Sequence, residues 1–147
     1  MRSSDFWETA EHQSFVDATD PDRAEAFRDL VLLASLADDI LTNEERVDIA
    51  LSFGKIPGIV LDFDSTELVD HIDDLHARKM RDAGLLVADL AERLGEDEAY
   101  NLHALRIISF VVRSHGFVPD EERFVRLFAT LVGLEPAIVD GVVEEIR

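Results

Sequence analysis

Apolar residues recur at intervals of three and four along almost the whole chain, and this spacing places side chains on one face of an α-helix. No segment shows the strict alternation of apolar and polar residues that is typical of a half-buried β-strand. The 147 residues are enough for one domain with a core of its own. The sequence therefore predicts a single all-α domain over residues 1–147.

Start and stop signals divide this pattern into about seven to eight helices. Asp5 and Glu8 have the spacing of a capping box, and Asp20 followed by Pro21 pairs an N-cap residue with a first-turn proline. Gly84 predicts a break or kink between a fourth and a fifth helix. The expected helices begin near residues 5, 20, 42, 64, 84, 97, 120 and 136.

The apolar stripe of the second expected helix contains Ala24, Phe27 and Val31, and Leu30 broadens it. The most apolar helix is expected over residues 97–115.

Two segments 77 residues apart resemble each other. The shift places residues 44–46, Glu-Glu-Arg, on residues 121–123, which are also Glu-Glu-Arg. Each copy has the pattern of an apolar helix, a tight polar turn, and a helix that begins with two glutamates. Because such a helix pair cannot bury its apolar face alone, the repeat predicts a compact bundle of two pseudo-symmetric halves.

The charge balance limits the classes of partner. Fourteen basic and 32 acidic residues give a net charge of -18, while 47% of the residues are hydrophobic, so a folded domain with an acidic surface is expected. Such a surface repels nucleic-acid phosphates and anionic membranes. The expected partners are therefore proteins or cations, and the oligomeric state stays open.

Residues and motifs that the sequence lacks limit the cellular location and the catalytic chemistry of the protein. The chain has no cysteine, which excludes disulfides, zinc–cysteine sites and thiol catalysis. The longest apolar run, residues 30–37, is far too short to cross a membrane, and no targeting segment is visible. Phosphate-binding glycine loops, nucleophile elbows and zinc-protease motifs are also missing from the sequence. We expect a cytoplasmic protein that is not an enzyme.

The first candidate site is the polar turn that contains Asp38, Asp39, Glu44 and Glu45. Calcium and magnesium prefer oxygen ligands, so carboxylates gathered at a bend favour a divalent cation of this class as the one expected cofactor. The alternative is structural, because Thr42 and Glu45 have the spacing of a capping box. The cation site and the capping box both remain possible interpretations of this turn.

The second candidate site is the matching turn of the repeat, with His115, Asp120, Glu121 and Glu122. Acidic residues in the first turn of a helix favour the helix dipole, which is the alternative explanation for these three carboxylates. If the two turns meet in space, their side chains would form one cation site. The alternative function is a metal-independent interaction module whose acidic surface binds a basic partner.

At these two turns the sequence resembles the tellurite-resistance TerB family, whose domain also occurs in a membrane-anchored J-domain co-chaperone. The family pattern is Ala-Asp-Gly, a variable residue, Ile or Val, three more residues and then Glu. Residues 37–45, Ala-Asp-Asp-Ile-Leu-Thr-Asn-Glu-Glu, follow it with Asp39 in place of glycine. Residues 114–122 follow it less closely, with His115 in place of the aspartate, and residues 121–134 resemble the closing helix.

The resemblance covers about residues 27–143. It implies an all-α domain in two similar halves and a non-enzymatic protein linked to metal or oxidative stress and to membrane-associated complexes. It also implies that acidic residues bind a cation, and by position these are Asp38, Glu45 and Glu122. The replacements at Asp39 and His115 leave open whether both halves of that site are kept.

Overall fold

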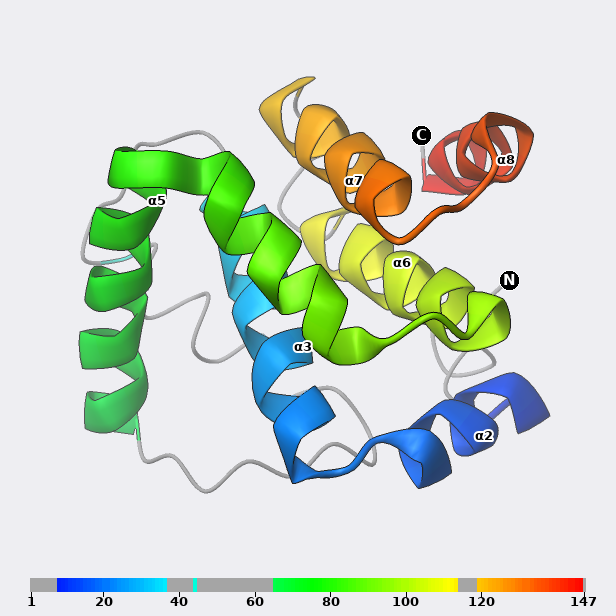
Figure 1. The fold of residues 1–147 in the computed structure, drawn as a ribbon, viewed down its shortest axis with the longest axis horizontal. Coiled ribbons are helices and arrows are strands. Elements are labelled where there is room, and N and C mark those ends of the chain that lie inside the picture. Colours follow the sequence, from blue (N-terminus) through cyan, green and yellow to red (C-terminus); the bar gives the residue numbers. More distant parts are fainter. Residues whose placement is uncertain (1–7, 37–43, 45–64, 114–118, 147) are drawn as a thin grey trace.

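The computed structural model describes residues 8–36, 44, 65–113 and 119–146, and every regular element among them is an α-helix (Figure 1). The all-α prediction is confirmed for this part of the chain. No described helix combines the length and the apolarity needed to cross a membrane. The helices are α2 (Ala10–Ala18), α3 (Pro21–Ser35), α5 (Ser65–Leu94), α6 (Glu98–Arg113), α7 (Pro119–Leu131) and α8 (Pro136–Ile146).

Helix α3 forms the centre of the bundle and packs against α5, α6 and α7 (Figure 1). Residues 26–34 are all buried, so nearly the whole circumference of the helix is covered. The stripe predicted from the sequence is therefore too narrow. A helix with neighbours on several sides buries more than one face, and here it also buries the charged Arg28 and Asp29.

The first described helix, α2, begins at Ala10, later than the capping box predicted at Asp5 and Glu8. Thr9 has extended backbone angles (φ -79°, ψ 156°), and its side chain accepts a hydrogen bond from the His12 amide at 3.1 Å. Thr9 is thus the N-cap of α2. The predicted cap Asp5 lies outside the described residues.

The kink in α5 is real, but its position differs from the prediction. Asp82 has non-helical angles (φ -161°, ψ 88°), whereas the sequence pointed to Gly84. The Asp82 carboxylate accepts a hydrogen bond from the Leu85 amide at 3.0 Å, so it acts as the N-cap of the second half of the helix. The bend in Figure 1 is therefore set by an aspartate cap.

The C-terminal helices complete the core. Gly133 has φ +79°, a left-handed conformation that glycine adopts without strain, and it lets the chain turn from α7 into α8. Helices α7 and α8 both pack against α6. The buried apolar residues of these three helices include Leu105, Ile107, Ile108, Phe124, Val125, Phe128, Val139, Val142 and Val143.

Candidate functional site

The first predicted cation turn falls mostly outside the described residues. Asp38, Asp39 and Glu45 lie there, and Glu44 is described only as an exposed residue in a helix. The structure therefore describes no contact among these four side chains.

The second predicted turn is described from Pro119 onward, and its three carboxylates lie in the first turn of α7. Asp120 is ion-paired with Arg123, and a Glu122 oxygen lies 3.6 Å from Arg126 Nε. Glu121 is buried, with 6% of its surface exposed. His115 lies outside the described residues.

The ion pairs of Asp120 and Glu122 with arginines give these two carboxylates a structural role. Arg126 also donates to Asp140 on α8 at 2.8 Å, and this hydrogen bond raises the pKa of Arg126. Asp120 and Glu122 thus bind cationic side chains of their own helix, and Arg126 joins that helix to α8. Among the residues that the structure describes, no three histidine or acidic side chains are grouped closely enough to hold a metal ion.

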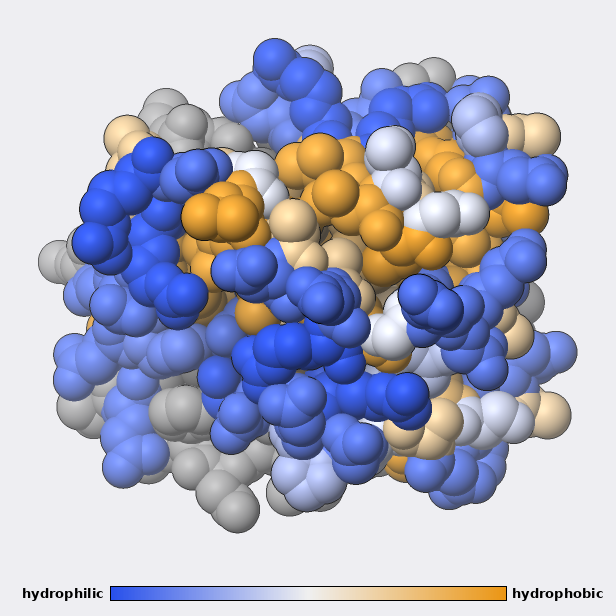
Figure 2. All heavy atoms as spheres, viewed as in Figure 1, coloured by the Kyte–Doolittle hydropathy of each residue, from blue (hydrophilic) through white to orange (hydrophobic). Residues whose placement is uncertain are grey.

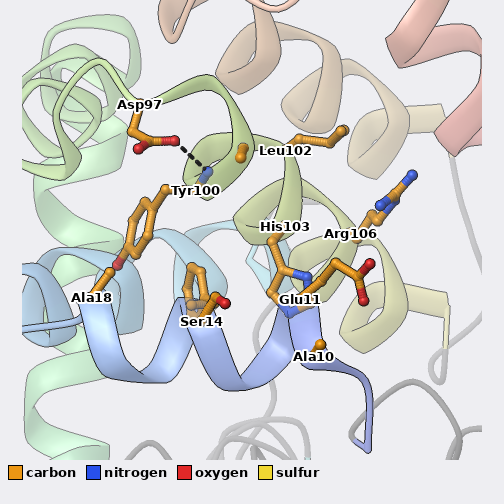
Figure 3. Close-up of a pocket in the computed structure, with 11 residues that line it drawn as sticks. Ala10, Glu11, Ser14, Ala18, Asp97, Tyr100, Leu102, His103 and Arg106 are labelled. Carbon is orange, nitrogen blue, oxygen red and sulfur yellow. Dashed lines mark hydrogen bonds between the residues drawn. The ribbon is translucent and has the colours of Figure 1, made fainter.

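A groove with a volume of about 410 Å³ lies between α2 and α6 (Figure 3). Helix α2 contributes small residues to its wall, so the two helices leave space between them. Figure 3 shows Asp97 and Tyr100 toward one end of the groove and Glu11 and Arg106 toward the other. The residues from α2 that line it are Ala10, Glu11, Ser14, Phe15 and Ala18.

Stacked aromatic rings join α2 to the bundle beside this groove. The rings of Phe15 and Tyr100 are stacked with centroids 4.4 Å apart, and Phe27 of α3 meets Phe15 edge-on at 5.2 Å. The Tyr100 hydroxyl lies 2.9 Å from the Thr19 hydroxyl oxygen. Burial raises the pKa of Tyr100, so this hydroxyl keeps its proton at neutral pH.

Two buried histidines complete the contact between α2 and α6. His12 Nδ1 lies 3.0 Å from His103 Nε2, and only 3% and 5% of the two residues are exposed. The pKa of His103 is lowered to about 4, mainly by burial and further by the nearby His12 and Arg106. His103 is therefore neutral at pH 7, and the groove is bordered by an uncharged imidazole.

A second buried polar cluster lies between α3 and α5. Arg28 Nε donates to Asp29 Oδ1 at 2.9 Å, and His71 Nε2 lies 2.7 Å from the same oxygen. The side chains of Arg28 and Asp29 are 7% and 8% exposed, and that of His71 is 21% exposed. A carboxylate between two donors that are largely removed from water stabilises the packing of α3 on α5.

Large apolar side chains are exposed on two helices. Leu127 and Leu131, one turn apart on α7, are 38% and 41% exposed, and Met80 and Leu85, on either side of the α5 kink, are 63% and 61% exposed. Figure 2 shows apolar side chains gathered in the region of α7 and α8, with hydrophilic side chains around them. Exposed apolar residues with a polar rim are typical of interaction surfaces.

Sequence reasoning missed the histidine pair and the buried cluster at Asp29. His12 and His103 are 91 residues apart, and His71 follows Asp29 by 42 residues. Neither pair forms a motif, because each contact is made only when two distant helices pack. One signal was available at Arg28 and Asp29, which interrupt a run of apolar residues and were therefore candidates for a buried ion pair.

The chain matches no protein-family model, no curated protein and no solved structure in the comparisons made with it.

Proposed function

We propose that this chain is a TerB-like, non-enzymatic stress-response or scaffold domain of the cytoplasm, which binds protein partners without a metal ion. The observation that carries the proposal is the difference between the charged first turn of α7 and its exposed apolar residues. Two of its three first-turn carboxylates pair with Arg123 and Arg126, whereas Leu127 and Leu131 expose apolar surface to water. Acids that already bind arginines are poor cation ligands, while exposed leucines gain free energy when a partner covers them.

The surrounding charge defines the kind of partner. Helix α8, which packs on α7, carries Asp140, Glu144 and Glu145 and has no basic residue. The whole chain has a net charge of -18. A partner helix with one apolar face and basic residues beside it would cover the leucines and meet complementary charge.

The architecture of two similar halves is part of the proposal and has support from the helix positions. A shift of 77 residues moves α3 onto residues 98–112, which lie within α6, and moves α2 onto 87–95, which overlap the second half of α5. Counting the kinked α5 as two helices, and adding the helix expected near residue 42, gives a bundle of eight.

The cation hypothesis stays a prediction beside this one. Its candidate ligands Asp38, Asp39 and Glu45 lie outside the described residues, and it rests on the carboxylates gathered at that turn and on the resemblance to TerB domains. The ion titration in the Discussion tests it separately.

A labelled basic amphipathic peptide tests the proposal. We would measure fluorescence anisotropy with a leucine- and lysine-based helix of about 18 residues, and compare a scrambled peptide of equal composition that has no apolar face. Covering two half-exposed leucines corresponds to roughly 1.5 kcal/mol, so the double variant Leu127→Ser/Leu131→Ser should weaken binding about tenfold. Binding should be unchanged in EDTA.

The matched control is Met80→Ser/Leu85→Ser, which removes two exposed apolar side chains from α5 instead. It should change the dissociation constant less than about twofold. Equal losses in both double variants, or equal binding of the scrambled peptide, would show that attraction to the acidic surface is unspecific and would overturn the proposal.

A further inference from the structure

Helix α2 depends on α6 for its stability. It has nine residues, and a helix this short is marginal in water on its own. Its only extensive helix–helix contact among the described elements is with α6. Whatever weakens that contact is therefore expected to release α2 while the rest of the bundle stays folded.

The contact between α2 and α6 includes the His12–His103 pair, which changes from attractive to repulsive when both rings are protonated. When both imidazoles are neutral, or when only one is charged, one of the facing nitrogens donates and the other accepts, which satisfies the 3.0 Å contact between His12 and His103. When both rings are charged, every ring nitrogen is a donor. Two N–H groups and two positive charges then face each other in a buried place, and the contact becomes repulsive.

The groups around the pair favour its neutral form. The described charges that act on His103 are His12 and Glu11 of α2 and Arg106 of α6, and only Glu11 favours the charged ring. Glu11 is exposed to solvent, so its attraction is screened. From α3 the neighbouring contacts are the uncharged Phe27 against Phe15, and Arg23, whose Cζ lies 5.2 Å from the Tyr100 ring centroid.

We propose that the His12–His103 pair makes the docking of α2 onto α6 sensitive to pH, so that mild acid releases α2 and uncovers the aromatic rings beside the groove. Release lets the His103 imidazole take up a proton in water. It also exposes the faces of Phe15 and Tyr100 that stack on each other in the docked form. The protein thereby gains an acid-dependent apolar surface that is separate from Leu127 and Leu131.

The size of the effect follows from proton linkage. His103 has a pKa of about 4 when docked, against an ordinary value of 6.5. Releasing this one histidine should raise the open fraction of α2 about 30-fold between pH 7.5 and pH 5.

Amide hydrogen exchange of the full chain, read by mass spectrometry at pH 7.5 and pH 5, tests the proposal. Labelling times are scaled for the intrinsic exchange rate, and EDTA keeps metal ions from the two imidazoles. Protection of residues 10–18 should fall by about 30-fold, and at both pH values it should stay well below that of α7, which opens only with the whole bundle. Equal protection of the two helices at both pH values, or no loss in α2, would overturn the proposal.

Glutamine variants identify the residues responsible. His103→Gln and His12→Gln each keep a hydrogen-bonding side chain that does not titrate, so the pH effect on α2 should be reduced in each. His76→Gln, a histidine of α5, should retain the full effect. If the variants at positions 12 and 103 lose protection at pH 5 as the unaltered protein does, the pair is not the switch.

A titration of the unaltered protein keeps the proposal testable if a variant does not fold. The imidazole carbon-bound protons of His103, followed by NMR, should titrate well below pH 6.5 in the docked state. An ordinary titration near pH 6.5 with α2 still protected would overturn the proposal.

Discussion

Asp20 and Asp97 lie 77 residues apart and make the same hydrogen bond. Asp20 Oδ1 accepts from the Arg23 amide at 2.8 Å, and Asp97 Oδ1 accepts from the Tyr100 amide at 3.0 Å. Each aspartate begins one of the two helices that supply much of the core, α3 and α6. This separation equals the shift that relates the two Glu-Glu-Arg segments.

We expect Asp20→Ala and Asp97→Ala each to lower the free energy of unfolding by about 1 kcal/mol, because each leaves an amide of a first helical turn without its acceptor. Urea unfolding monitored by circular dichroism measures the change. Asp89→Ala, which removes an exposed aspartate from the interior of α5, is the control and should stay within about 0.5 kcal/mol of the unaltered protein. Equal costs at all three positions would contradict the capping role.

Global stability should depend on pH through His103. Its pKa is lowered in the folded state to about 4, so below pH 6.5 the unfolded chain binds a proton that the folded chain does not. This contribution is therefore complete above pH 6.5 and is lost as the pH falls toward 4. Between pH 7.5 and pH 4.5 we expect a loss of roughly 2 to 3 kcal/mol from this residue.

The measurement compares urea unfolding of the unaltered protein and His103→Gln at both pH values. The many carboxylates titrate in both proteins, so the difference between them isolates the imidazole. Parallel pH dependences would show that His103 titrates normally in the folded state.

The buried cluster at Asp29 predicts that replacing a single carboxylate with an amide lowers stability strongly. Asp29→Asn removes the charge of the carboxylate that pairs with the buried Arg28 guanidinium, and we expect the free energy of unfolding to fall by about 3 kcal/mol. The double variant Arg28→Met/Asp29→Leu removes both charges and should recover most of that loss. A double variant less stable than Asp29→Asn would mean that the pair stabilises the fold beyond satisfying its own charges.

Divalent ions separate the interaction function from the cation hypothesis. Thermal unfolding of chelator-stripped protein with calcium, magnesium, manganese or zinc should show similar small shifts for all four ions, because an acidic surface is screened by any of them. An ion held only by the folded protein at 100 times its dissociation constant would add about 2.7 kcal/mol, a shift of several degrees. Such a shift from one ion would contradict metal-independent function.

If one ion does stabilise the protein, two double variants locate its site. Asp38→Asn/Glu45→Gln should abolish the shift if the first turn holds the ligands. Asp70→Asn/Asp74→Asn, on the exposed side of α5, should leave it unchanged.

The helical class and most helix limits could be predicted from the sequence because their signals are local. Asp20-Pro21 begins α3, Asp97 caps α6, and Pro136 begins α8, all as expected. The α5 kink shows that local signals can place a helix boundary wrongly by two residues, since Gly84 and Asp82 are both residue types that can break a helix. The carboxylate of Asp82 caps the helix that follows, and this decided the position.

The candidate sites were predicted less well than the fold. Three acids in the first turn of α7 could be expected, and the pairing of Asp120 with Arg123 and of Glu122 with Arg126 follows from helical spacing. The burial of Glu121 and the bond from Arg126 to Asp140 depend on the packing of α7 against other helices. The sequence identified Asp120 and Glu122 as candidate cation ligands, and in the structure both pair with arginines of α7.

By itself, then, the sequence determined the all-α class, the strongly acidic surface and the capped ends of α3 and α6, since each depends on residues within one or two helical turns or on composition alone. Tertiary structure decided which helix lies at the centre, where Leu127 and Leu131 meet water, and that His12 meets His103. Those outcomes depend on contacts between helices far apart in the chain. Periodicity shows that a helix has a face to bury, but only packing determines what that face meets.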